Sequence, residues 1–285
     1  MKQSILIICL VALGWMNTSL AYNKANLQAL KRTGDCIGCD LSGADLSWLD
    51  LRGSDLSSAN LTGALFAHTR VSGARLREAN LAGVNLAEMD LSAIDGPGAS
   101  FRGANLTGTN LTGANLTGAD LADVDLSDSV ITGATFRWAD LHRVDLSGRD
   151  LRDVLLYGAD FKSATLTGAD LRGVNLGQAN FEQADTRGML VIGANLSQGV
   201  LTSANLSGID FSGVSLVEAD LSGSSLIESD LSRSDLRNAI LGGIDLSKTN
   251  ITGVDLSAAD LSGATLVGTD LGGVKLAGAN LDGAD

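Results

Sequence analysis

The stretch ANLTGTNLTGANLTGAD, residues 104–120, places a leucine at every fifth position and surrounds it with small or polar residues. The same spacing continues in one register from Leu41 to Leu281, over 49 positions that hold 37 Leu, six Phe, two Val and two Ile. Only Gly96 and Thr186 interrupt this column. Self-similarity of this length without an insertion predicts one continuous repeat structure.

A second column, of small residues, lies two positions before the first. It is mostly Ala or Val, and Asp or Asn stands between the two columns, as in Ala119-Asp120-Leu121. A period of five would carry the leucines around every side of an α-helix and would alternate their direction along a long strand. The pattern fits a three-residue extended segment with both columns pointing inward, followed by a two-residue corner. Repeated corners wind the chain into stacked coils.

The motif A-(D/N)-L-x-x, as in "ANLTG", "ADLSG" and "VDLSG", resembles the pentapeptide-repeat family, and the resemblance covers residues 40–285. It implies an all-β fold, a right-handed quadrilateral parallel β-helix with four pentapeptides in each coil. The interior of such a helix holds ladders of Leu and Phe, so we expect Phe161 to stack on Phe181 one coil further on. A filled interior leaves no room for a buried ligand.

Residues 1–21, MKQSILIICLVALGWMNTSLA, are typical of a secretory signal peptide, with Lys2, an apolar run, and small residues before the cleavage site. We expect an exported chain that begins at Tyr22 and has no membrane anchor. Its compartment would be the periplasm, the exterior, or the thylakoid lumen in a photosynthetic source. The sequence has 33 acidic and 20 basic residues, and loss of Lys2 gives a net charge of −14. This charge disfavours nucleic acid and anionic membranes as partners.

Residues 22–39 are expected to form an N-terminal cap. The segment NKANLQALKRTG, residues 23–34, carries the signals of a short helix, with Leu27 and Leu30 on one face and Gly34 as its stop. In an exported protein we predict a disulfide between Cys36 and Cys39. The alternative is a CxxC redox site, which normally opens a helix beside a thioredoxin-like sheet.

The final repeats carry no comparable capping segment, and an open edge of strands invites pairing with another chain. We therefore expect either a homodimer through this C-terminal edge or a frayed polar edge.

Three positions depart from the repeat. Gly96-Pro97-Gly98 predicts a kinked or loosened corner. Thr186 is expected to be a tolerated polar residue in the core. Arg149 occupies an inward position, where an unpaired charge is costly, so we predict a bulge that brings its head to water beside Asp150 or Asp153.

The sequence contains no motif for nucleophilic or acid–base catalysis, phosphate binding or metal ligation, so we expect no enzyme activity, no cofactor and no metal. His68 is expected to stack on Trp48 as surface packing. Most acidic residues occupy the position before the large inward residue, so that Asp120, Asp140 and Asp160 would repel one another at the ~4.8 Å spacing of strands. We interpret these ladders as solvated surface.

One segment carries outward-facing aromatic and basic residues, which are the types that anchor protein interfaces. These form the candidate interaction patch: Arg137, Trp138, His142, Arg143, Arg152 and Tyr157. Arg137 and Tyr157 are one coil apart, so we expect a cation–π contact between them.

The favoured hypothesis is a non-enzymatic exported rod that acts as a scaffold or protein-interaction module. The resemblance also implies an alternative, a mimic of duplex DNA, because some cytosolic relatives protect gyrase from quinolones in this way. A DNA segment as long as the rod, about 60 Å, carries about 35 charges, against a net charge of −14 here. A redox protein built on the CxxC motif is the third and weakest option.

Overall fold

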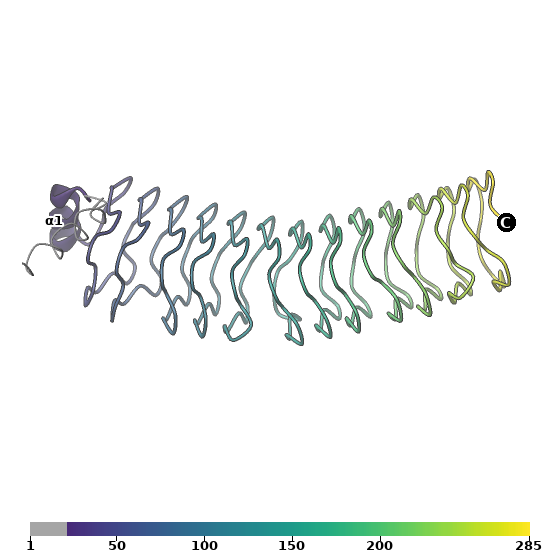
Figure 1. Ribbon diagram of the computed structural model, residues 1–285, viewed down its shortest axis with the longest axis horizontal. Coiled ribbons are helices and arrows are strands. Elements are labelled where there is room, and N and C mark those ends of the chain that lie inside the picture. Colours follow the sequence, from purple (N-terminus) through teal and green to yellow (C-terminus); the bar gives the residue numbers. More distant parts are fainter. Residues whose placement is uncertain (1–21) are drawn as a thin grey trace, which may run out of the picture.

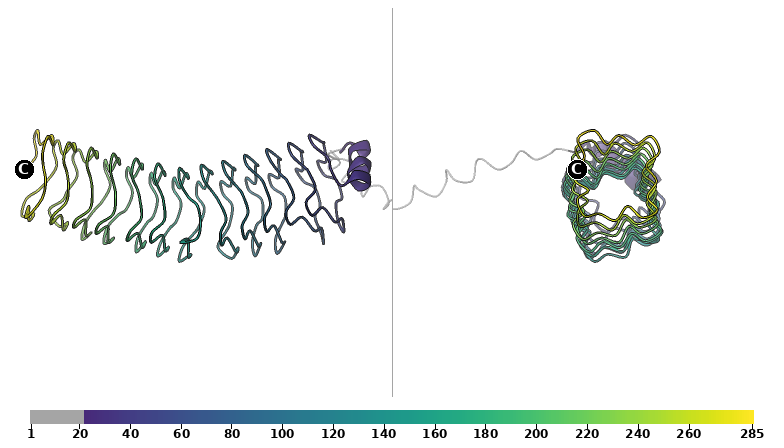
Figure 2. Two further views of the ribbon diagram at one scale, coloured as in Figure 1. Left: turned by 180° about the vertical axis from the view of Figure 1, so that it is seen from behind. Right: turned by 90° about the vertical axis from the view of Figure 1, so that its right-hand side faces the viewer.

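The chain turns a corner every five residues and returns to the same face after twenty. In the computed structural model, which describes residues 22–285, residues pair in parallel with those twenty positions on, as Asp40 does with Asn60. Each pairing is a single-residue bridge because the extended segments are so short. The product is the predicted right-handed quadrilateral parallel β-helix, a rod of stacked coils (Figure 1) with a four-sided outline along its axis (Figure 2). The predicted signal peptide lies outside the described residues.

Both inward columns are buried, as the sequence predicts. Leu121 and Ala119 are fully shielded from solvent, and Phe161 stacks on Phe181 with ring centroids 5.1 Å apart. Thr186 is also fully buried, and its hydroxyl donates to the carbonyl of Asn205 at 2.6 Å. A polar residue is tolerated in this column because its one donor is satisfied.

Where Asp or Asn stands between the columns, its side chain usually closes the corner that follows. Its Oδ1 accepts the backbone N–H two residues further on, as Asp45 does from Ser47 at 3.0 Å and Asp160 from Lys162 at 3.0 Å. This hydrogen bond is an Asx turn, which favours a reversal of the chain. The interpretation as solvated surface missed this role, because spacing alone does not reveal side-chain to backbone bonds.

The four faces differ in how continuously their coils are bonded. On the face of residues 40, 60, 80 and onward, parallel bridges run unbroken from Asp40 to Asn280. The small inward column there is Ala in every coil from Ala59 to Ala279 except for Gly199. On the face of residues 50, 70, 90 and onward, that column contains Leu, Thr, Met, Ser, Arg and Ile, with a single alanine, Ala169.

Bridges are missing from this second face, within residues 22–285, at four steps: Arg70 to Asp90, Val130 to Asp150, Leu190 to Asp210 and Asn250 to Asp270. At these steps the inward residue of the later coil is Met89, Arg149, Ile209 or Thr269. Each gap follows an inward side chain larger than alanine, but size alone does not open the ladder, because the bridges persist at Met189 and Thr249.

The helix α1, Lys24–Thr33, covers the first coil (Figure 1). Asn23 caps its N-terminus by accepting from the N–H of Ala25 at 2.9 Å, and Gly34 ends it with a φ of 82°. Leu27 and Leu30 are its buried residues, as predicted. They face the end of the core and exclude water from it.

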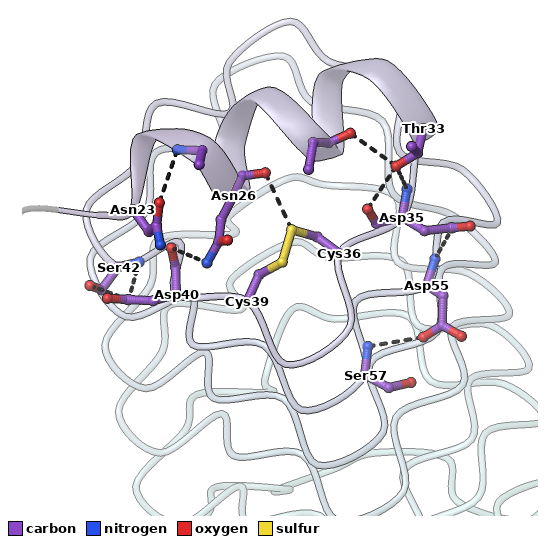
Figure 3. Close-up of a disulfide and its surroundings, with 12 residues drawn as sticks. Asn23, Asn26, Thr33, Asp35, Cys36, Cys39, Asp40, Ser42, Asp55 and Ser57 are labelled. Carbon is purple, nitrogen blue, oxygen red and sulfur yellow. Dashed lines mark hydrogen bonds between the residues drawn. A yellow bond between two sulfur atoms is a disulfide. The ribbon is translucent and has the colours of Figure 1, made fainter.

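Cys36 and Cys39 form a disulfide directly beneath α1 (Figure 3). Cys36 stands in the large inward column and Cys39 in the small one, so the bond replaces a Leu–Ala pair of the repeat. Ladder bonding has already begun here, because the N–H of Cys36 donates to the carbonyl of Asp55 at 2.8 Å. The carboxylate of Asp35 accepts a hydrogen bond from the N–H of Asp55 at 2.7 Å. This N–H lies at the start of the ladder, and the side chain of Asp35 takes the place of a backbone acceptor.

The predicted kink at Gly96-Pro97-Gly98 is wrong. The N–H of Gly96 donates to Asn115 at 2.8 Å, and the carbonyl of Pro97 accepts from Glu78 at 2.9 Å, so the ladder passes through this corner. The first residue of a corner donates only to the Asx side chain. Proline at that position therefore removes no ladder bond, and its fixed φ suits the turn.

The predicted surroundings of Arg149 are also wrong. Its guanidinium donates to the backbone carbonyls of Ser127 and Ser129 on the preceding coil, and not to Asp150 or Asp153. The neighbouring coil supplies acceptors closer than the surface carboxylates do.

The Asx corners predict a loss of stability in acid. The side chain of Arg52 lowers the pKa of Asp50 from 3.8 to about 2, and the hydroxyl and N–H of Ser257 with Lys275 lower the pKa of Asp255 to about 2. A carboxyl with a lowered folded pKa stabilises the fold above its unfolded pKa and loses that contribution as pH falls through the folded value. We expect the melting temperature, measured by circular dichroism, to hold down to about pH 4 and then to fall towards about pH 2.

The variant Asp255→Asn is the matched control, because it keeps the acceptor for the corner but cannot titrate. It should lose less stability than the parent over that interval. A melting temperature that stays level to about pH 2 would contradict the assignment.

Candidate interaction site

Large side chains at the corners lie against glycines of the following coil. Trp138 has a left-handed backbone, with φ 60°, and its ring occupies the space that a Cβ at Gly158 would need. A Cβ at Gly177 would lie 3.0 Å from Cε2 of Tyr157. Because glycine has no side chain, both aromatic rings can pack directly against the backbone of the following coil.

Trp138 and Tyr157 form one aromatic corner. Their ring centroids are 5.2 Å apart at an interplanar angle of 86°, an edge-to-face arrangement, and Trp138 is 52% exposed. The ring beside Tyr157 is therefore that of Trp138, and the predicted cation–π pair with Arg137 is not among the contacts of residues 22–285. Arg137 is exposed at the same corner.

His142 and Arg143 lie on the next edge of the rod. Arg143 donates two hydrogen bonds to Asp123 on the preceding coil, from Nε at 2.5 Å and from Nη2 at 2.6 Å. Its Nη1 lies 2.9 Å from Nε2 of His142. This pairing lowers the pKa of Asp123. The charge of Arg143 is therefore balanced within the protein.

Arg152 lies on the edge at the other side of the aromatic corner, so the predicted patch wraps around two faces and is not one plane. It binds both oxygens of Asp150, at 2.9 and 2.6 Å, and holds the pKa of that carboxyl well below its usual range. Of the four basic or imidazole positions in the patch, Arg143 and Arg152 are already paired. The surface that remains is the aromatic corner with Arg137.

The acidic ladder beside this corner is partly neutralised. Arg102 donates from Nε to Asp120 at 2.9 Å and from Nη2 to Asp140 at 3.4 Å, and Asn180 donates to Asp160 at 2.9 Å. The repulsion expected among the three carboxylates is thus relieved by side chains of adjoining coils.

A second exposed aromatic pair lies near α1. His68 stacks on Trp48, as predicted, with centroids 4.1 Å apart and 29° between the planes, and Trp48 is 75% exposed. A cleft of about 290 Å³ adjoins this pair between Leu65 and Asn85, where a bridge is missing from the described residues. The sequence predicted the stack but gave no signal for the cleft.

Residues 22–285 contain no cluster of three His, Cys, Asp or Glu side chains arranged to hold a metal ion. None of their helices has the length and apolar character needed to cross a membrane.

The fold and corners define a solenoid of five-residue units, and the sequence comparisons give its family. The family profile described as "Pentapeptide repeats" matches in eight copies, at residues 35–57, 59–95, 74–113, 109–148, 150–188, 175–216, 215–253 and 255–285. The chain belongs to the pentapeptide-repeat family. Comparison with curated protein sequences found no significant match.

Several solved structures are similar to the chain. HetL, involved in heterocyst differentiation regulation in the cyanobacterium Nostoc sp. strain PCC 7120, is 31% identical over 91% of this chain and 93% of its own, with a TM-score of 0.25. Trypsin-treated QnrB1, a plasmid-mediated fluoroquinolone resistance protein, is 22% identical over 82% and 92%, with a TM-score of 0.36. A thylakoid-lumen pentapeptide-repeat protein of Arabidopsis thaliana is 33% identical over 44% and 74%, with a TM-score of 0.13.

The packing of the Trp138 ring against Gly158 can be tested with Gly158→Ala. Alanine at this φ of 69° costs about 1 kcal/mol in backbone strain and also displaces the indole. The matched control is Gly168→Ala, where φ is 68° but nothing lies within 4 Å of the new Cβ. In a Trp48→Phe background beginning at Tyr22, we expect a shifted tryptophan emission from Gly158→Ala alone. Identical spectra for the two variants would contradict the packing.

Proposed function

We propose that the protein is an exported, non-enzymatic rod that serves as a scaffold or protein-interaction module and contacts a protein partner at the Trp138–Tyr157 corner. The observation that carries this proposal is the partly exposed edge-to-face pair of Trp138 and Tyr157, with Arg137 exposed at the same corner. Partly exposed Trp and Tyr with a neighbouring arginine are the side chains that contribute most at interfaces.

Two features of the described chain favour binding over catalysis. The inward columns fill the interior with Leu, Phe and Ala, so a substrate has no enclosed cavity in the coil core. Charged groups on the edges beside the aromatic corner are engaged in ion pairs, as Arg143 is with Asp123 and Arg152 with Asp150. Neither arrangement offers a poised acid, base or nucleophile.

Export is supported by the sequence of residues 1–21 and by the disulfide. Disulfides persist in the periplasm, outside the cell and in other oxidising compartments, and are rare in the cytosol. The Cys36–Cys39 bond lies under α1, where it fixes the junction between cap and coil. The same enclosure favours a structural role over a redox site, because Cys36 is only 3% exposed.

The gyrase-protection alternative fits the surface less well. Arg102, Arg143 and Arg152 each pair with carboxylates, so the exposed charge is more evenly balanced in the middle of the rod than the net value suggests. Duplex DNA, by contrast, carries a negative charge at about every 1.7 Å along its axis without interspersed cations of its own.

A homodimer is a separate part of the proposal. In the final coil Leu271 and Leu281 are 46% and 40% exposed, and a second copy would cover them. A monomeric mass by light scattering at tens of micromolar would remove the homodimer and leave the aromatic corner unaffected.

The proposed function is tested in cells that express the full chain. Fractionation and mass spectrometry should find a mature chain that begins at Tyr22, outside the cytoplasm, with Cys36 and Cys39 oxidised. A photo-crosslinking residue at Arg137 should then capture a defined protein, and the pair Trp138→Ala and Tyr157→Ala should abolish the capture without changing the circular dichroism spectrum.

The matched control places the crosslinker at Ser257, further along the same edge of the rod. Equal capture from that position, or capture that survives loss of both rings, would refute the interface. An uncleaved cytosolic chain with free thiols would refute export.

A further inference from the structure

Arg149 is the only charged residue in either inward column of the repeat between residues 41 and 281. Every other member of the small column is apolar, a hydroxyl residue, glycine or cysteine. A guanidinium at such a position loses water contacts that a surface arginine keeps. Its presence therefore requires partners within the wall of the rod.

The partners that the described chain offers satisfy only part of the guanidinium. Nη1 donates to the carbonyl of Ser127 at 2.5 Å, and Nη2 donates to that of Ser129. Nε is buried and has no partner among residues 22–285. Arg149 also takes part in none of the ion pairs of the described chain, unlike its neighbour Arg152, which pairs with Asp150. A buried donor and an unbalanced charge thus remain.

The coil ladder is open at the same place. The bridge from Val130 to Asp150 is missing, and the N–H groups of Ile131 and Asp150 have no backbone acceptor in the described part of the chain. A cleft of about 310 Å³ separates the two coils there, lined by Asp128, Ser129, Val130, Ile131, Thr132, Gly148, Arg149 and Asp150. Three unpartnered N–H donors therefore belong to residues that line one cleft.

The open amides alone do not distinguish this cleft, because within residues 22–285 the equivalent amides are also without backbone acceptors at the gaps that follow Met89, Ile209 and Thr269. The cationic group of Arg149 is what those other gaps lack. Nε of Arg149 is a buried donor without a partner in the described chain, which is rare in proteins. A positive charge among free donors selects an anion.

We propose that the Arg149 cleft binds a carboxylate group, held by Nε of Arg149 and the N–H groups of Ile131 and Asp150. The guanidinium is planar and matches the planar carboxylate better than an ammonium would. Asp128 on the rim repels a doubly charged phosphate more strongly than a single carboxylate. The site lies away from the Trp138–Tyr157 corner and is independent of the function proposed there.

The test is an NMR-monitored titration of the ¹⁵N-labelled chain that begins at Tyr22. The probes are acetate, a free carboxylate, and N-acetylglutamate methylamide, a stand-in for a partner's glutamate side chain, with chloride at equal ionic strength as the blank. We expect saturable shifts of the Arg149 Nε–H and of the Ile131 and Asp150 amides. If acetate binds at least as tightly as the blocked glutamate, the natural ligand is a free carboxylate anion. If the blocked glutamate binds about tenfold more tightly than acetate, the ligand is a glutamate side chain of a partner protein.

Three variants keep the proposal falsifiable. Arg149→Ala should abolish the shifts, Arg149→Lys should weaken binding about tenfold, and Arg152→Gln should leave it within about twofold because Arg152 serves Asp150. The parent chain alone is decisive if Arg149→Ala does not fold. Linear shifts that do not saturate, unchanged binding in Arg149→Ala, or tighter binding of inorganic phosphate than of acetate would overturn the proposal.

Discussion

Alanine in the small inward column lets successive coils pack closely enough to bond without interruption. Alanine permits an unbroken ladder from Asp40 to Asn280 along one face, whereas Met89, Arg149 and Ile209 coincide with gaps along another. The leucine column supplies the cohesion of the core, because truncation of one such buried leucine to alanine costs about 2–5 kcal/mol. The rod therefore combines a uniform core with a wall that opens at defined places.

The same register controls what the surface can present. Most corners are closed by an Asx turn, and the second residue of most corners adopts a left-handed backbone, as Trp138 does with its ring over the next coil. Gly158 accommodates Trp138 in this way, and Gly177 leaves room for Tyr157, which is the first residue of its corner. Aromatic groups consequently become fixed on the outside of a rigid scaffold, which is the physical basis for proposing an interface there. The arginines nearby serve mainly to balance carboxylates.

Much of this structure follows from the sequence because its signals are local and repeated. The helix between Asn23 and Gly34 was predictable from its caps, and the Cys36–Cys39 bond from the expected export of the chain. The Phe161–Phe181 and Trp48–His68 stacks followed from the four-pentapeptide coil that the family resemblance implies.

Other features depend on contacts that spacing leaves open. The partner of Tyr157 depends on the direction in which a corner side chain leans. The tolerance of Pro97 depends on which N–H the ladder uses, and the acceptors of Arg149 belong to the preceding coil.

Hydrogen exchange of individual backbone amides tests the link between inward side-chain size and coil bonding most directly. Amides that donate across the alanine face, such as Asp140 to Ala119 and Asp160 to Ala139, should be the most protected. The amides of Asp90, Asp150 and Asp210, which follow the gaps, should exchange far faster than amides of the alanine face at similar positions along the rod. Equal protection on the two faces, or greater protection at the gaps, would contradict the account.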